Sequence, residues 1–81
     1  MTRYYFDLRD NEMPTVDEEG MVLPTLQAVQ IEAARSLVDM AKHAIWEKAT
    51  VLGHRMAIEV RDENGPVLQA KFTFELDHHK Q

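Results

Sequence analysis

Cysteine is absent from this chain of 81 residues, and glycine is scarce. Without cysteine there is no disulfide framework, no thiolate nucleophile and no thiolate zinc site, which suits a protein of the reducing cytoplasm. Gly20, Gly53 and Gly65 are isolated from one another, so the sequence has no glycine-rich loop of the kind that cradles phosphates. We therefore expect a cytoplasmic protein without a nucleotide-binding loop.

Long apolar runs are also missing. The chain starts without the apolar segment of a signal peptide, and no stretch approaches the roughly eighteen apolar residues of a membrane span. Basic charge is limited as well, because nine lysines and arginines face fourteen acidic residues and leave a net charge of −5. An acidic chain without a basic stripe is not expected to bind a membrane surface or, through counterion release, nucleic acid.

The remaining composition is that of a small globular domain. Hydrophobic residues make up 44% of the chain and charged residues 28%, which is ordinary for a folded protein and unlike a disordered one. We expect residues 1–81 to form a single domain, with 77–81 as a frayed tail. A chain of this length buries only about 60–65% of its unfolded surface, so its stability is a small remainder.

No set of residues has the spacing of a catalytic or metal site. Ser36, the only serine, falls in the middle of a predicted helix rather than on a nucleophile elbow. The acidic run Asp17-Glu18-Glu19 does not match a calcium loop and is interpreted as a solvated turn. His78 and His79 are adjacent and would face opposite ways on a strand. The sequence therefore predicts no enzyme, no cofactor and no metal, and we assign no catalytic, cofactor-binding or metal-binding residue.

Two polar groups on the predicted strands have both a chemical and a structural interpretation. Asp7 and Glu59 are expected to face each other on the exposed side of the sheet, but a carboxylate pair without a pocket is no acid–base system. Tyr5, flanked by arginines, is placed to stack on a base. An aromatic ring that shields the sheet beside an arginine stem is the interpretation that suits an acidic protein.

The last third of the sequence predicts a β-hairpin. Apolar and polar residues alternate through 55–61 and again through 68–75, so one face of a sheet is buried and the other is exposed. Val60 must pair with a residue of the same face, for which Leu68 is suitable. A three-residue loop, Glu63-Asn64-Gly65, gives that register, and a five-residue loop is the alternative.

The start of the chain predicts another strand. Tyr4, Phe6 and Leu8 alternate with polar residues, as they do in a strand with one buried face. A short second strand is expected within 14–23, confined to a sheet edge by Pro14 and the acidic run.

A long helix follows these strands. Thr25 is the expected N-cap, and neither proline nor glycine interrupts residues 26–49 before Gly53 ends the helix. One apolar stripe of the helix should pack on the sheet. It consists of Leu26, Val29, Ala33, Leu37, Met40, Ala41 and Ala44.

A second apolar stripe lies beside the first, centred about 120° around the helix. It consists of Ile31, Ala34, Val38, Ile45 and Ala49, with Trp46 further round. Because one sheet face cannot cover both stripes, either the 10–24 loop or the C-terminal residues fold over the second one, or it is a contact between subunits, which we favour. The predicted interaction surface is Ile31, Val38, Ile45 and Trp46. Trp46 is the expected anchor, and a tryptophan that lies against its own chain is the alternative.

Four stretches of the sequence resemble a known family. They are Arg3-Tyr4-Tyr5-Phe6-Asp7-Leu8-Arg9-Asp10, Asp17-Glu18-Glu19-Gly20, Leu23-Pro24-Thr25-Leu26 and the alanine-rich helix start at Ala28, Ala33 and Ala34. Together they resemble a family of small domains of unknown function from nitrogen-fixing and related soil proteobacteria. The resemblance implies a bacterial cytoplasmic setting and no active site. The chain departs from the family pattern at Asn11-Glu12, where members often carry glycine.

A fainter likeness links the order of strands, leucine-proline turn and threonine-capped helix to the antitoxin half of small toxin–antitoxin pairs, although fold does not imply function. We expect an α+β fold of order ββαββ, with an antiparallel sheet of three to four strands and one long helix packed on one face. The predicted function is a non-enzymatic protein-interaction or regulatory module that self-associates as a homodimer or binds another protein. An antitoxin-like or nucleic-acid-associated regulator is the alternative.

Overall fold

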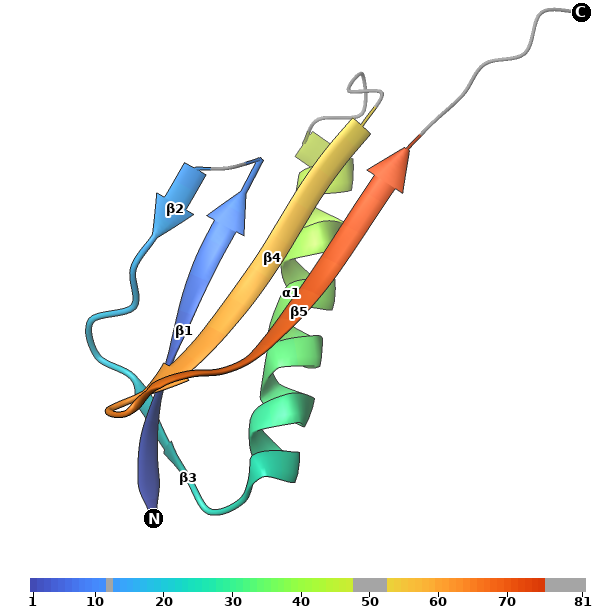
Figure 1. Cartoon of the computed structure of the whole chain (residues 1–81). Coiled ribbons are helices and arrows are strands. Elements are labelled where there is room, and N and C mark those ends of the chain that lie inside the picture. Colours follow the sequence, from blue (N-terminus) through green and yellow to red (C-terminus); the bar gives the residue numbers. More distant parts are fainter. Residues whose placement is uncertain (12, 48–52, 76–81) are drawn as a thin grey trace, which may run out of the picture.

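The computed structural model describes residues 1–11, 13–47 and 53–75, and the side chains of 44–47, 53 and 54 lie outside that description. The elements are β1 (Thr2–Asp10), β2 (Met13–Thr15), β3 (Met21–Leu23), α1 (Leu26–Glu47), β4 (Gly53–Asp62) and β5 (Gly65–Glu75). The strands form one antiparallel sheet, and the helix lies across one face of it (Figure 1). The predicted α+β fold is confirmed, although the described sheet has five strands, because two short strands, β2 and β3, stand where a single one was predicted within 14–23.

The sheet has the order β2-β1-β4-β5, and β3 pairs with the first part of β1. β2 is paired with Leu8–Asp10 and β3 with Thr2–Tyr4, both antiparallel to β1. Between these two pairings, the five residues Val16–Gly20 face only the three residues Tyr5–Asp7. The longer segment cannot stay in register with the shorter one, so the edge strand bulges outward and is split in two.

β4 and β5 form the predicted hairpin, and Val60 pairs with Leu68 as expected. The predicted loop 63–65 is wrong, because Asp62 pairs with Gly65 and leaves a two-residue turn. An irregularity next to Val60 absorbs the odd residue. Because of this bulge, the apolar residues of both strands lie on one face of the sheet. The predicted pairing of Val60 with Leu68 was based on that requirement.

Thr25 caps the helix as predicted. Its Oγ1 accepts a hydrogen bond from the N–H of Ala28 at 3.0 Å, and its carbonyl oxygen accepts one from the N–H of Val29 at 3.2 Å. These bonds satisfy amides at the start of the helix that have no partner within it. α1 runs from Leu26 to Glu47, and residues 48–52 lie outside the described part of the chain.

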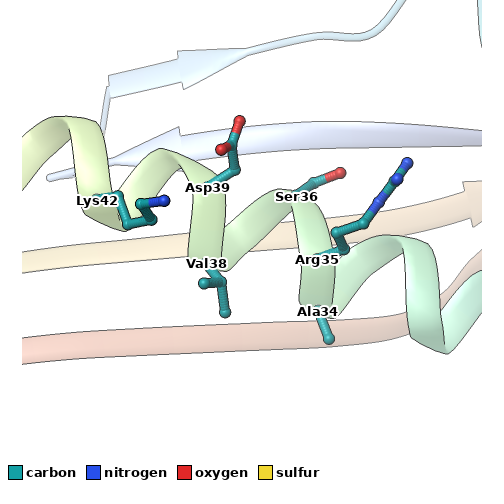
Figure 2. A pocket seen from close by; sticks show the side chains of 6 residues that line it. All are labelled: Ala34, Arg35, Ser36, Val38, Asp39 and Lys42. Atoms are coloured by element: carbon teal, nitrogen blue, oxygen red, sulfur yellow. The ribbon is translucent and has the colours of Figure 1, made fainter.

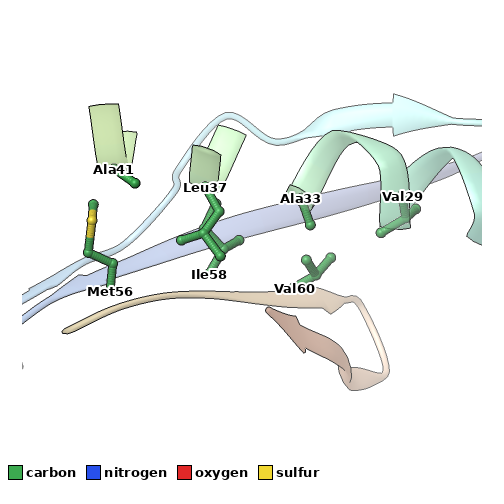
Figure 3. Close-up of a cluster of buried hydrophobic side chains, with 7 residues drawn as sticks. All are labelled: Val29, Ala33, Leu37, Ala41, Met56, Ile58 and Val60. Atoms are coloured by element: carbon green, nitrogen blue, oxygen red, sulfur yellow. The ribbon is translucent and has the colours of Figure 1, made fainter. Parts of the chain in front are cut away.

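The core lies between α1 and the inner face of the sheet (Figure 3). Its buried members are Val29, Ala33, Leu37 and Ala41 of α1 and Met56, Ile58 and Val60 of β4. Partly buried residues of β1 and β5 surround them, and the helix packs mainly against β4 and β5. The first apolar stripe therefore meets the sheet as predicted, over the central strand and one edge strand.

Leu26 is an exception to the predicted core, since it is 50% exposed. It lies one turn before Val29, and Val60, the last buried residue of β4, lies beneath Ala33 and to one side of Val29 in Figure 3. The helix therefore starts beyond the end of the buried part of the sheet. Ala44 also belongs to the predicted stripe, but its side chain lies outside the description.

Two valines provide a matched test of this core. Val60 is 1% exposed, whereas Val16 is 62% exposed. Val60→Ala removes buried methyl groups and leaves a cavity, so we expect the free energy of unfolding to fall by roughly 2–3 kcal/mol. Val16→Ala removes the same atoms from an exposed position and should change it by less than about 0.5 kcal/mol. Urea unfolding measures both variants, and equal losses would contradict this placement of the core.

Candidate interaction surface

The carboxylate of Asp17 fixes the segment that separates β2 from β3. Its Oδ2 accepts a hydrogen bond from the N–H of Phe6 at 3.1 Å, opposite the gap in the edge strand. Its Oδ1 accepts hydrogen bonds from the N–H groups of Glu19 and Gly20, both at 3.2 Å. The side chain thus supplies a missing rung of the sheet and closes a tight turn. The prediction of a solvated acidic turn is wrong for Asp17, which is half-buried, whereas Glu18 and Glu19 are exposed.

Gly20 lets this turn press against β1. Its φ is +73°, and a Cβ atom here would lie 2.9 Å from the carbonyl oxygen of Tyr4 and 2.9 Å from Cε1 of Tyr5. Both the backbone conformation and the close approach require glycine.

Arg61 and Asp7 join Asp17 on the outer face of the sheet, opposite α1. Arg61 donates from Nε to Oδ2 of Asp7 at 2.8 Å and from Nη2 to the carbonyl oxygen of Asp17 at 3.1 Å. Oδ1 of Asp7 accepts a hydrogen bond from the N–H of Asp17 at 2.9 Å. The Arg61 guanidinium lies 4.5 Å from the ring centroid of Tyr5, which matches the structural interpretation of that ring. We refer to Tyr5, Asp7, Asp17 and Arg61 as the charged cluster.

Hydrogen bonding lowers the pKa of Asp17. Partial burial raises its pKa, but the amides of Phe6, Gly20 and Glu19 and the charge of Arg61 outweigh burial, so the pKa lies below the ordinary value of 3.8. The carboxylate is therefore ionised at neutral pH. The hydrogen bond to Asp7, in turn, raises the pKa of Arg61. The charged groups of the cluster stabilise one another and the fold.

Asp7 and Glu59 are direct cross-strand partners, as predicted. They do not act as a carboxylate pair, because each has its own cation. Asp7 binds Arg61, while Glu59 lies 3.6 Å from Nη2 of Arg9 and accepts a hydrogen bond from Gln69 at 3.3 Å.

The two edges of the sheet are built differently. One edge consists of the three-residue strands β2 and β3, is interrupted at Val16–Gly20 and contains Pro14. These features keep an edge from pairing with another chain. At the other edge β5 runs for eleven residues, and β4 is its only neighbour among the described strands. Because Pro66 stands near its start, most of β5 offers an uninterrupted edge to a further strand.

The exposed apolar stripe of α1 lies on the same side of the molecule as β5. Ile31 is 61% exposed and Val38 is 59% exposed, and Ala34 is exposed between them. In Figure 2, Ala34 and Val38 point to the β5 side of the helix, whereas Ser36 and Asp39 point away from it. We refer to Ile31, Ala34 and Val38 together with the free edge of β5 as the open side.

The predicted cover of this stripe by the 10–24 loop is absent. β2 and β3, the two strands that this loop forms, lie along β1 at the opposite edge of the sheet. The C-terminal residues 76–81, the other predicted cover, lie outside the described residues. Of the predicted interaction residues, Ile31 and Val38 belong to the open side. Ile45 and Trp46 belong to α1, but their side chains lie outside the description, so their placement stays a prediction.

A hollow of about 760 Å³ runs along this part of the helix (Figure 2). It is lined by Ala34, Arg35, Ser36, Val38, Asp39 and Lys42. All six residues belong to α1, so no second element among those described encloses the hollow. It therefore resembles a surface open to a partner more than the enclosed cleft of a small-molecule site.

A family described as a domain of unknown function, DUF6894, matches residues 3–73. The chain belongs to this family. The DUF6894 match runs from β1 into β5 and confirms the resemblance to a family of small domains of unknown function. No curated protein and no solved structure matches the chain significantly. Within the described ranges, no three acidic or histidine side chains converge to hold a metal ion, and no helix has the length and apolarity to cross a membrane.

Asp17→Asn tests the role of the carboxylate. The variant keeps the shape of the side chain but weakens the bonds to the backbone amides, so we expect it to lose roughly 1–2 kcal/mol of stability at pH 7. Because the folded pKa of Asp17 is depressed, its contribution is complete above 3.8 and is lost as the pH falls through the folded pKa. The stability difference between wild type and variant should therefore shrink below about pH 4.

Glu18→Gln is the matched control, since it removes the same charge from an exposed neighbour. Its effect on the free energy of unfolding should be small at every pH. A difference for Asp17→Asn that does not shrink as the pH falls below about 4, or equal effects of the two variants, would contradict the assigned role of Asp17.

Proposed function

We propose that this member of the DUF6894 family is a non-enzymatic interaction module that self-associates through its open side. The observation that carries this proposal is that two features lie on the same side of the molecule. There the sheet has its long free edge, and the helix beside it exposes Ile31 and Val38. Contiguous exposed apolar surface and an unpaired strand are each typical of a contact with another chain.

A second copy fits the free edge by symmetry. A two-fold axis perpendicular to the sheet sets β5 of one copy antiparallel to β5 of the other, so each backbone group finds the same kind of partner. Paired residues must share a face, and a pairing centred on Ala70 meets this condition over the five residues from Leu68 to Phe72, which lie beyond the bulge. It sets Leu68 opposite Phe72 on the face that carries α1, which extends the apolar layer across the seam.

The same symmetry brings the two helices together. Each α1 lies over β4 and β5, so the helices of the two copies become neighbours above the joined strands. Ile31 and Val38 of one copy then face those of the other, and the small Ala34 between them permits close approach. Full burial of an isoleucine or valine side chain is worth roughly 1.5–3 kcal/mol. Four such side chains supply a large part of the about 8 kcal/mol that a micromolar dimer needs.

The charged cluster supports the non-enzymatic part of the proposal. Asp7, Asp17 and Arg61 bind one another and the backbone of the edge segment. Groups engaged in this way hold the fold and are not poised for proton transfer. A regulatory role in the bacterial cytoplasm fits the absence of cysteine from the sequence and forms part of the same proposal.

Val38→Asp tests the proposed dimer. Val38 is exposed in the protomer, so the variant should fold normally. In the dimer the new carboxylate would be buried against the second copy, which should weaken association at least about tenfold. Sedimentation velocity over a range of micromolar concentrations should show a dimer for wild type and a monomer for the variant.

His43→Asp is the control, because it places the same carboxylate on an exposed position of the polar side of α1. This control should associate as wild type does. A wild-type chain that stays monomeric at every concentration, or a His43→Asp variant that dissociates as fully as Val38→Asp, would refute self-association through the open side.

A further inference from the structure

The outer face of the sheet gathers basic residues in a chain that is acidic overall. Of the nine lysines and arginines in the sequence, five project from this face: Arg3, Arg9, Arg55, Arg61 and Lys71. Two of them hold the segment that separates β2 from β3. Arg61 belongs to the charged cluster, and Arg3 donates a hydrogen bond to the carbonyl oxygen of Glu19 at 2.7 Å. The other three gather at one place.

Ala57 lies at the centre of that place. Its cross-strand partners are Arg9 on β1 and Lys71 on β5. Paired residues have Cβ atoms about 4.5–5.5 Å apart on the same face, so the two cations flank the methyl group of Ala57. Arg55 follows two residues away on β4 and faces Thr73 of β5. Three strands therefore present three cations around one small residue.

The small side chain leaves a hollow between the larger ones. It measures about 190 Å³ and is lined by the three cations together with Met56, Ala57, Gln69 and Thr73. Ala57 is only 8% exposed and forms its floor, while Gln69 and Thr73 are exposed at its rim and add neutral hydrogen-bond donors.

Positive charge is in excess here. Glu59, 3.6 Å from Arg9, is the neighbouring carboxylate, and it also accepts a hydrogen bond from Gln69. Among the described residues, no carboxylate forms an ion pair with Arg55 or Lys71. Like charges on neighbouring strands destabilise a sheet, and an anion held between them would remove that repulsion.

We propose that this hollow, formed by Arg9, Arg55 and Lys71 around Ala57, binds the phosphoryl group of a small phosphorylated molecule. Two guanidinium groups and one ammonium group suit the tetrahedral, doubly charged oxygens of a phosphate monoester. A nucleic-acid strand is disfavoured, because a net charge of −5 repels a long polyanion while leaving a local site for one phosphate. The site lies on the outer face, so it stays open whether or not β5 pairs with a second copy, and it is independent of the proposed function.

Titration of the full chain with inorganic phosphate and with glycerol 2-phosphate, followed by the amide resonances in NMR spectra at low salt, tests the proposal. We expect saturable shifts for both probes, concentrated at Ala57, Lys71 and Thr73, with dissociation constants on the order of a millimolar or below. A short single-stranded DNA is titrated in parallel.

Arg55→Gln and Lys71→Gln should each weaken binding of glycerol 2-phosphate about tenfold, since each removes a charge-assisted hydrogen bond. Both residues are exposed. Two variants are measured so that the proposal is still tested when one of them fails to fold. Arg35→Gln is the control, because Arg35 lies on the helix in an ion pair with Glu32. It should bind as wild type does.

Several results would overturn the proposal. They are shifts that do not saturate or that scatter over the surface, binding of inorganic phosphate but not of the monoester, and equal losses in Arg35→Gln. Tighter binding of the DNA than of the monoester, with a steep dependence on salt, would identify a polyanion site instead.

Discussion

α1 covers one face of the sheet and lies over β4 and β5, where the side chains of Val29, Ala33 and Leu37 pack on β4. One helix cannot bury its whole apolar circumference against a single sheet, so the residues on the side of β5 remain in contact with solvent. The free edge of β5 and the exposed Ile31 and Val38 are consequences of that one arrangement. The outer face is left open by it as well, which is why charged residues can gather there.

The edge formed by β2 and β3 shows how the same sheet avoids pairing with another chain. The five residues Val16–Gly20 lie opposite only three residues of β1. The carboxylate of Asp17 accepts the hydrogen bond from the N–H of Phe6 that a backbone carbonyl of a regular strand would have accepted. Gly20 and Arg61 hold the displaced segment in place. An edge broken in this way does not accept another strand, so the sheet has one direction left in which it can grow.

Sequence patterns that depend on neighbouring residues predicted much of this structure. The cap at Thr25, the pairing of Val60 with Leu68 and the exposure of Ile31 and Val38 follow from local hydrogen bonding and from periodicity. Asp17 could not be assigned, because its role depends on a mismatch between two strands that the sequence does not display. The hollow around Ala57 was missed for a similar reason, since it requires the register of three strands. An aspartate three residues before Gly20 was the one local signal of the turn.

Hydrogen exchange of β5 amides at different protein concentrations tests the central claim most directly. The account predicts that amides of β5 that point away from β4 become protected as the concentration rises from about 1 µM to about 200 µM, because a second β5 strand then binds them. Amides of β2 and β3 serve as the internal reference and should exchange at the same rate throughout. Exchange of β5 that is independent of concentration would contradict the claim that this edge is where the protein associates.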